Sequence, residues 1–171
     1  MKTRHCLTLA LALLALPASA AELSVKIEQP TLPVAEYHRP YLAVWLEKTD
    51  GSAVTQLAVW YDQNKKDNAG TKWLKDLRQW WRKGGRDLAM PVDGVAGATR
   101  APGVHTLYWN SQKAPLNQLP AGDYQLMVEA AREGGGREVV RVPVSWPGKT
   151  PRQTSAQGQQ ELGTITVQVK P

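Results

Sequence analysis

The stretch Tyr124-Gln125-Leu126-Met127-Val128-Glu129-Ala130-Ala131 carries the clearest strand signal in the chain, because polar and apolar side chains alternate along it. Three glycines follow at 134–136, and a second apolar-rich segment covers residues 137–144. Two such segments joined by a short glycine turn predict a β-hairpin. This hairpin favours an antiparallel β fold.

Further strand signals lie on both sides of this hairpin. Alternation or short apolar runs predict strands at residues 22–28, 41–47, 54–61, 103–109 and 162–169. The dipeptide Asp50-Gly51 predicts a hairpin turn between the second and third of these strands. The polar segments 62–71 and 150–160 are predicted to be loops. About seven short strands separated by turns indicate a mainly β protein, an antiparallel, broadly Ig-like β-sandwich.

One short helix is predicted within this β pattern, at about residues 72–83. Its apolar side chains fall on one helical stripe and consist of Trp73, Leu74, Leu77, Trp80 and Trp81. Such stripes usually pack against a core, so we interpret most of this one as packing. Adjacent side chains on a helix diverge, and we therefore expect one of Trp80 and Trp81 to point inward and the other to lie nearer the surface.

The first 20 residues have the organisation of a secretory signal peptide. Lys2 and Arg4 precede an apolar run at 7–16, and small residues at 17–20 predict cleavage after Ala20. The apolar run is too short to span a bilayer, and no later segment comes close, so we expect no integral membrane protein. The only cysteine, Cys6, leaves with the signal peptide. Residues 21–171 are thus predicted to form a single exported, periplasmic domain without disulfides.

The formal net charge is +6, and removal of Lys2 and Arg4 leaves +4 on the mature chain. Much of this charge lies in residues 72–83, where lysines and arginines alternate with tryptophans. A basic aromatic patch can bind nucleic acid. In an exported protein an acidic partner or an anionic surface is favoured, and we expect no nucleic acid. The alternative function for this chain is therefore a non-redox binding module that docks an acidic partner through its basic Trp-rich helix.

Residues 93–99 form the most specific motif, which reads D-x-x-x-G-A-T from Asp93 to Thr99. Glycine lets the backbone turn freely and approach a bulky group closely. We therefore expect Thr99 to lie on an accessible loop between the helix and the next strand. A phosphoester requires such an accessible hydroxyl, while the attacked phosphoanhydride is held by metal ions of the modifying enzyme. We assign Asp93 to recognition by that enzyme and Arg100 to pairing with the phosphate.

This motif resembles the flavin-attachment sites of flavoprotein subunits in sodium-pumping quinone reductases and related ion-pumping complexes. Those sites usually have Ser at the position of Ala96. The resemblance implies FMN linked covalently to Thr99 by an FMN transferase, with Gly97 and Ala98 in the site. We expect a flavin-bearing electron carrier rather than an enzyme, since the flavin would carry the chemistry.

The mature chain also resembles a family of predicted periplasmic bacterial proteins, domain of unknown function 2271. The resemblance is carried by residues 35–41, 44–45, 57–62, 73–81, 97–103 and 129–133. It implies a periplasmic protein encoded near FMN transferases and PepSY-type membrane reductases. Such a reductase is the expected electron donor.

The remaining candidate residues carry weaker signals. Trp80 and Trp81 are candidates for stacking on the flavin ring, and His38 is a candidate for contact with the flavin or a partner. His38 and His105 have no spacing typical of a ligand pair, so no metal site is predicted. The nucleophile elbow G-x-S-x-G is absent, and no hydrolase is predicted.

Overall fold

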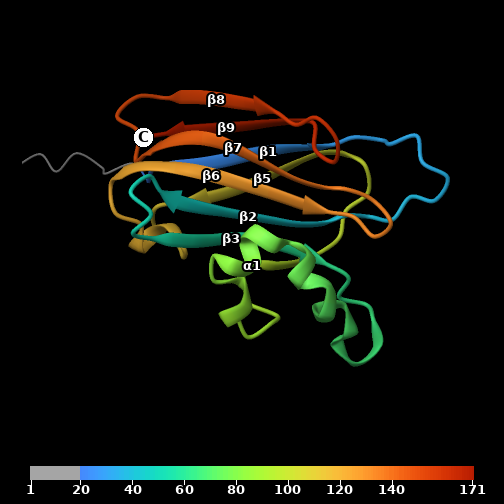
Figure 1. Cartoon of the computed structure of the whole chain (residues 1–171). Coiled ribbons are helices and arrows are strands. Elements are labelled where there is room, and N and C mark those ends of the chain that lie inside the picture. Colours follow the sequence, from blue (N-terminus) through green and yellow to red (C-terminus); the bar gives the residue numbers. More distant parts are fainter. Residues whose placement is uncertain (1–19) are drawn as a thin grey trace, which may run out of the picture.

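The computed structural model describes residues 20–171, in which two β-sheets face each other and a helical layer covers one of them (Figure 1). The signal peptide and its cleavage after Ala20 fall almost wholly outside the described residues. The first described strand and the last one are paired, with Glu22 opposite Lys170. The described chain therefore starts and ends at the same end of the molecule.

The first sheet has four antiparallel strands in the order β5-β1-β9-β8. Their bounds are Gly103–Asn110 for β5, Glu22–Gln29 for β1, Thr164–Lys170 for β9 and Arg152–Gln157 for β8. Three of these strands match the sequence prediction. Strand β8 corrects it, because it lies within the segment predicted to be a loop at 150–160.

The second sheet has five strands in the order β4-β3-β2-β6-β7. Their bounds are Ala96–Ala98 for β4, Val54–Tyr61 for β3, Tyr41–Lys48 for β2, Gly122–Ala131 for β6 and Arg137–Trp146 for β7. The hairpins β2-β3 and β6-β7 are as predicted. Strand β4 pairs in parallel with β3, whereas the other neighbours are antiparallel.

Both faces of the five-stranded sheet are buried. Leu42, Val44 and Leu46 of β2 point into the core between the two sheets, which confirms a β-sandwich. Ala43 and Trp45 point the other way, into a second core beneath the helical layer. Burial on both faces explains why β2 reads as an apolar run rather than as an alternating strand. The sandwich is confirmed, and its Ig-like character stays a prediction.

The helical layer consists of three short pieces rather than the single helix predicted at 72–83. They are the 3₁₀ segment η1 (Lys66–Asp76), the helix α1 (Arg78–Arg82) and the 3₁₀ turn η2 (Gly85–Asp87). The break falls at Leu77, whose ψ of 70° is not helical. The η1 segment also begins inside the predicted loop at 62–71. A third 3₁₀ turn, η3 (Leu116–Gln118), precedes β6.

The break in the helix has an identifiable cause in a buried carboxylate. Glu129 of β6 accepts hydrogen bonds from the backbone N–H groups of Gln79 (3.1 Å) and Trp80 (2.7 Å). These groups belong to the first turn of α1, where backbone donors lack a partner within the helix. Glu129 therefore starts a new helix at this point and fastens it to the sheet.

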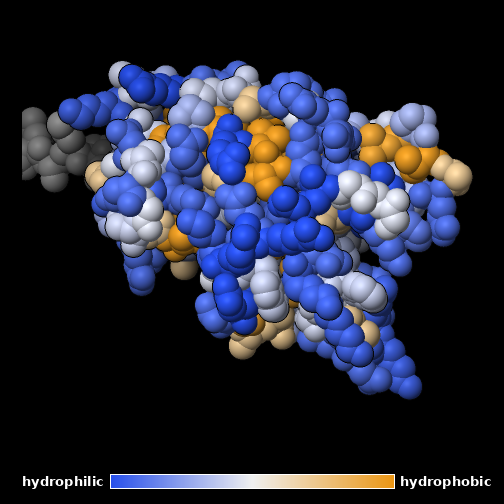
Figure 2. All heavy atoms as spheres, in the orientation of Figure 1, coloured by the Kyte–Doolittle hydropathy of each residue, from blue (hydrophilic) through white to orange (hydrophobic). Residues whose placement is uncertain are grey.

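Two further side chains join the helical layer to the sheet. Gln56 of β3 accepts a hydrogen bond from the Trp80 indole (2.7 Å) and donates one to the Lys83 carbonyl (3.0 Å). Trp80 is fully buried, and Trp81 is partly buried beside it, as the sequence predicted. Figure 2 shows that the outer surface on this side is mainly hydrophilic, with apolar side chains in small patches.

Candidate functional site

Thr99 directly follows β4 at the edge of the five-stranded sheet. The register places Ala96 opposite Val59, Gly97 opposite Trp60 and Ala98 opposite Tyr61. The backbone N–H of Thr99 then donates to the carbonyl of Tyr61 at 3.2 Å. Thr99 itself lies outside the strand, as predicted, but the preceding residues 96–98 form a short strand that the sequence did not predict. Thr99 itself remains partly exposed.

The local structure explains why the two positions 94 and 97 of the motif are glycine. Gly94 has a φ of +70°, a backbone conformation that favours glycine. A Cβ at Gly97 would lie 3.1 Å from Cδ1 of Trp60, so the strand passes close over this indole ring. Asp93 is exposed in the turn that leads into β4.

A large cleft lies at the end of the sheet where Thr99 is found. Strand β2 begins there, β3, β4 and β6 end there, and β7 begins there, so the connecting segments meet at one place (Figure 1). The cleft has a volume of about 730 Å³. Thr99 and His38 line it, together with residues from the segment before β2, from η1 and from the turn between β6 and β7.

Three aromatic side chains line the cleft. Trp73 of η1 is 49% exposed, although the neighbouring Leu74 and Leu77 are buried. Burial raises the pKa of Tyr37 and of Tyr41 above the ordinary tyrosine value. Both phenols therefore stay neutral and keep their donor proton at physiological pH. The Tyr41 hydroxyl donates to the Gly70 carbonyl at 3.0 Å and so holds η1 against the sheet.

Two arginines of the cleft are held by carboxylates. Arg132 donates two hydrogen bonds to Glu161, at 2.8 and 3.0 Å, and the bond to Glu161 raises the pKa of Arg132 further. The Gly136 N–H also donates to Glu161 (2.7 Å), which fixes the glycine turn. Arg137 donates to Glu129 at 2.7 Å. One wall of the cleft is therefore preorganised by ion pairs.

Three further cations line the cleft without an ion pair to any of residues 20–171, namely Arg39, Lys65 and Arg78. The acids Asp62, Asp76 and Glu133 also line it. The cleft thus combines aromatic surface and charged side chains with one threonine hydroxyl. A ligand with an aromatic ring system and an anionic group suits this lining.

The chain from residue 22 to residue 164 matches the model of a family described as predicted periplasmic protein, domain of unknown function 2271. The protein belongs to this family. In this member of domain of unknown function 2271 the match extends from β1 to the start of β9 and includes Thr99 and the whole cleft. Comparison with curated proteins and with solved structures gives no match.

Several other residues that the sequence analysis placed in the site lie away from the cleft. Trp80 is fully buried, and neither it nor Trp81 lines the cleft. The guanidinium of Arg100 lies 4.1 Å from the Trp60 ring centroid, outside the cleft lining. Trp73 is the tryptophan that the cleft does contain. The helical stripe assigned it to packing, whereas it lies half-exposed in the 3₁₀ segment η1.

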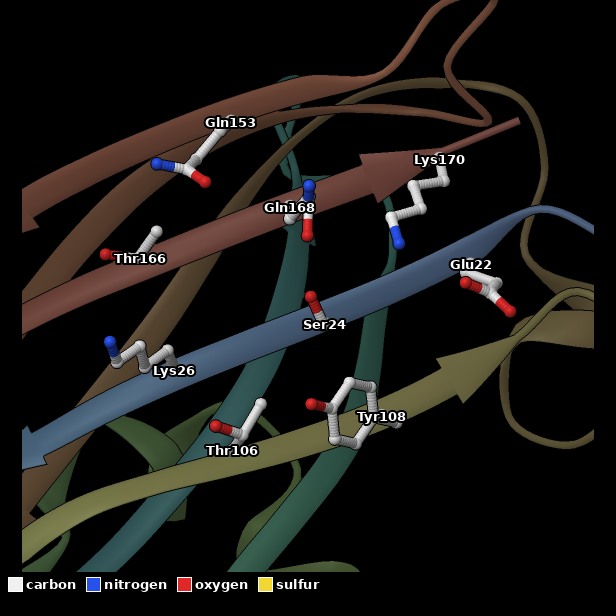
Figure 3. A pocket seen from close by; sticks show the side chains of 9 residues that line it. All are labelled: Glu22, Ser24, Lys26, Thr106, Tyr108, Gln153, Thr166, Gln168 and Lys170. Carbon is white, nitrogen blue, oxygen red and sulfur yellow. The ribbon is translucent and has the colours of Figure 1, made fainter.

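A second hollow lies on the outer face of the four-stranded sheet and is smaller, at about 330 Å³. Figure 3 shows that its polar side chains stand along β1, β5, β8 and β9. Its one aromatic residue is Tyr108, which is 76% exposed. None of the motif residues lines it, so it supplies control positions that are remote in the fold from the Thr99 cleft.

Within residues 20–171 no group of three His, Cys, Asp or Glu side chains is placed to hold a metal ion. No helix in the same range is long and apolar enough to cross a membrane.

Proposed function

We propose that this periplasmic protein is an electron carrier with FMN covalently linked to Thr99. The observation that carries the proposal is the position of Thr99: the acceptor residue of the D-x-x-x-G-A-T motif lines the large cleft.

The residues of the cleft suit a flavin. Its volume of about 730 Å³ falls within the range of about 300–1,000 Å³ typical of small-molecule pockets. Trp73 and Tyr37 offer aromatic surface, and arginines provide planar donors for a phosphate. When bound, the flavin supplies one- and two-electron transfer, while the protein positions it and tunes its potential.

This chain supplies the reacting Thr99 hydroxyl and the motif around it that the transferase recognises. The donor is a flavin dinucleotide in the active site of an FMN transferase, which supplies the base and the metal ions. The phosphoanhydride P–O bond and the Thr99 O–H bond break, and the Thr99 Oγ1–P bond forms. The proton leaves with the released nucleotide, and no atom changes its oxidation state. We take a PepSY-type membrane reductase as the electron donor, by the family resemblance.

The experiment is co-expression with an FMN transferase, followed by intact mass measurement. The wild-type chain should gain the mass of FMN less one water, and Thr99→Ala should not. Thr106→Ala is the matched control, since Thr106 is an exposed threonine on the opposite sheet. An unmodified wild-type chain, or a modification that survives in Thr99→Ala, would refute the proposal.

A second candidate function is docking of an acidic partner, and the charged helical layer favours it. Lys72, Lys75 and Arg82 are exposed on the outer side of this layer, beside the half-exposed Trp73. As a non-redox binding module the protein would be colourless, and its binding to an acidic polypeptide such as polyglutamate would weaken steeply with salt. A charge reversal at Lys72 and Lys75 should then abolish binding. Covalent flavin in the purified protein would exclude this as the whole function.

A further inference from the structure

We propose that the cleft binds the isoalloxazine ring of the attached flavin, with Trp73 as the stacking residue at its lip. The inference rests on the proposed function, because it assumes the tether at Thr99. It goes further by assigning the ring a site and a contact that the motif does not specify. Trp73 is a positioning residue in this account.

The strand order determines where a tethered group lies. At the cleft end of the sheet the order is Thr99 after β4, then the end of β3, the start of β2, the end of β6 and the start of β7. Neighbouring strands lie about 4.8 Å apart, so this row of five spans roughly 19 Å. Thr99 is at one end of the row. A group attached to its hydroxyl therefore extends along the cleft, toward Tyr41 and the β6-β7 turn.

The η1 segment forms the cover of this path and is fixed in place. Gly70 lies so close to the Asp62 backbone that no side chain fits there, and its carbonyl accepts the Tyr41 hydroxyl. Trp73 follows three residues later and lines the same cleft. The anchor at Gly70 therefore fixes the backbone near the residue from which the Trp73 indole extends.

Trp73 is the residue in this layer whose exposure has no packing explanation. The other apolar residues of the predicted stripe are buried or partly buried in the second core, whereas Trp73 leaves half of its surface in solvent. An offset-stacked aromatic partner would cover that surface and contribute about 0.5–1.5 kcal/mol beyond the area buried. The isoalloxazine ring has the size and flatness for this contact.

The turn between β6 and β7 also lines the cleft and offers polar contacts for the pyrimidine edge of the ring. Arg132 is buried and uses two of its five N–H donors on Glu161. The remaining donors and the adjoining glycine turn suit carbonyl oxygens.

The test is the fluorescence of the covalently attached flavin, because a stacked indole quenches an excited flavin by electron donation. Wild type, Trp73→Ala and Tyr108→Ala are each flavinylated by the transferase, and intact mass confirms one flavin per chain. Trp73 is half-exposed and Tyr108 is more exposed still, so both variants are expected to fold. Emission per flavin should rise severalfold in Trp73→Ala and stay at the wild-type level in Tyr108→Ala.

The possible failures are separate. If wild type gains no flavin mass, the attachment to Thr99 is wrong. If all three proteins carry flavin and Trp73→Ala emits like wild type, the attachment stands and the ring site at Trp73 is wrong. A rise in Tyr108→Ala equal to that in Trp73→Ala would also overturn the assignment, since it would show that the quenching is not specific to the cleft.

Discussion

The backbone N–H of Thr99 donates to the carbonyl of Tyr61, and this 3.2 Å hydrogen bond holds Thr99 at the end of the β3 strand. Tyr61 is buried in the second core, so its backbone is held firmly in the sheet. Thr99 is therefore held by the sheet rather than by a flexible loop. A cofactor held on a rigid element keeps a defined distance and orientation toward a redox partner.

The contact between Gly97 and Trp60 predicts a cost for any side chain at position 97. A Cβ there would lie 3.1 Å from the Trp60 ring, so Gly97→Ala must shift either β4 or the indole. We expect a loss of about 1 kcal/mol, which lowers the Tm by roughly 2–4 °C in a chain of this size. Thermal unfolding measures this, with Ala98→Ser at the exposed neighbouring position as control. Equal melting of Gly97→Ala and wild type would contradict the close approach.

The buried Glu129 predicts a larger effect on the helical layer. Glu129→Ala leaves the N–H groups of Gln79 and Trp80 without their acceptor and Arg137 without its partner. We expect a loss of about 2 kcal/mol or more in urea unfolding, because buried donors lose their hydrogen bonds. The near-ultraviolet circular dichroism of Trp80 should weaken as well. Glu133→Ala, at an exposed position on the same cleft, should leave both measurements unchanged.

The carboxylate of Glu138 predicts part of the acid sensitivity. Burial alone would raise the pKa of Glu138, but hydrogen bonds from four backbone N–H groups at 159–162 outweigh it and lower the pKa. A lowered folded-state pKa stabilises the protein above the unfolded value of about 4.3, and this contribution is lost as pH falls through the folded pKa.

Glu138→Gln should therefore melt at a lower temperature than wild type at pH 7. The difference in Tm should shrink as the pH is lowered from about 5 toward 3, because wild type then loses the same contribution. Thermal unfolding over this pH range measures it. A constant difference at every pH would show that Glu138 does not act through its charge.

The sequence predicts those strands whose side chains alternate or form apolar runs, and it misses two strands that depend on pairing alone. Strand β8 is mostly polar and has no fully buried residue, and it forms by pairing along the free edge of β9. Strand β4 consists of one glycine and two alanines, which have low strand preference. The helix at 72–83 was predicted as one piece because the stripe does not reveal the capping carboxylate of Glu129.

Of the residues that line the cleft, only Thr99 and His38 were named as site candidates in the sequence analysis. A local motif identifies Thr99, whereas the cleft depends on which strand ends meet in space. Trp73 and Tyr41 are far apart in sequence from Thr99, and no local pattern relates them. The order of the strands decides which residues meet at the cleft, and this order arises from pairing between distant parts of the chain.

The most direct test of the account is the mass of one peptide. Trypsin cleavage after Arg86 and Arg100 releases residues 87–100, in which Thr99 has the only hydroxyl side chain. After co-expression with an FMN transferase, this peptide should carry FMN less one water and absorb as a flavin. An unmodified peptide from the fully expressed and exported protein, or flavin found on any other peptide, would contradict attachment at Thr99.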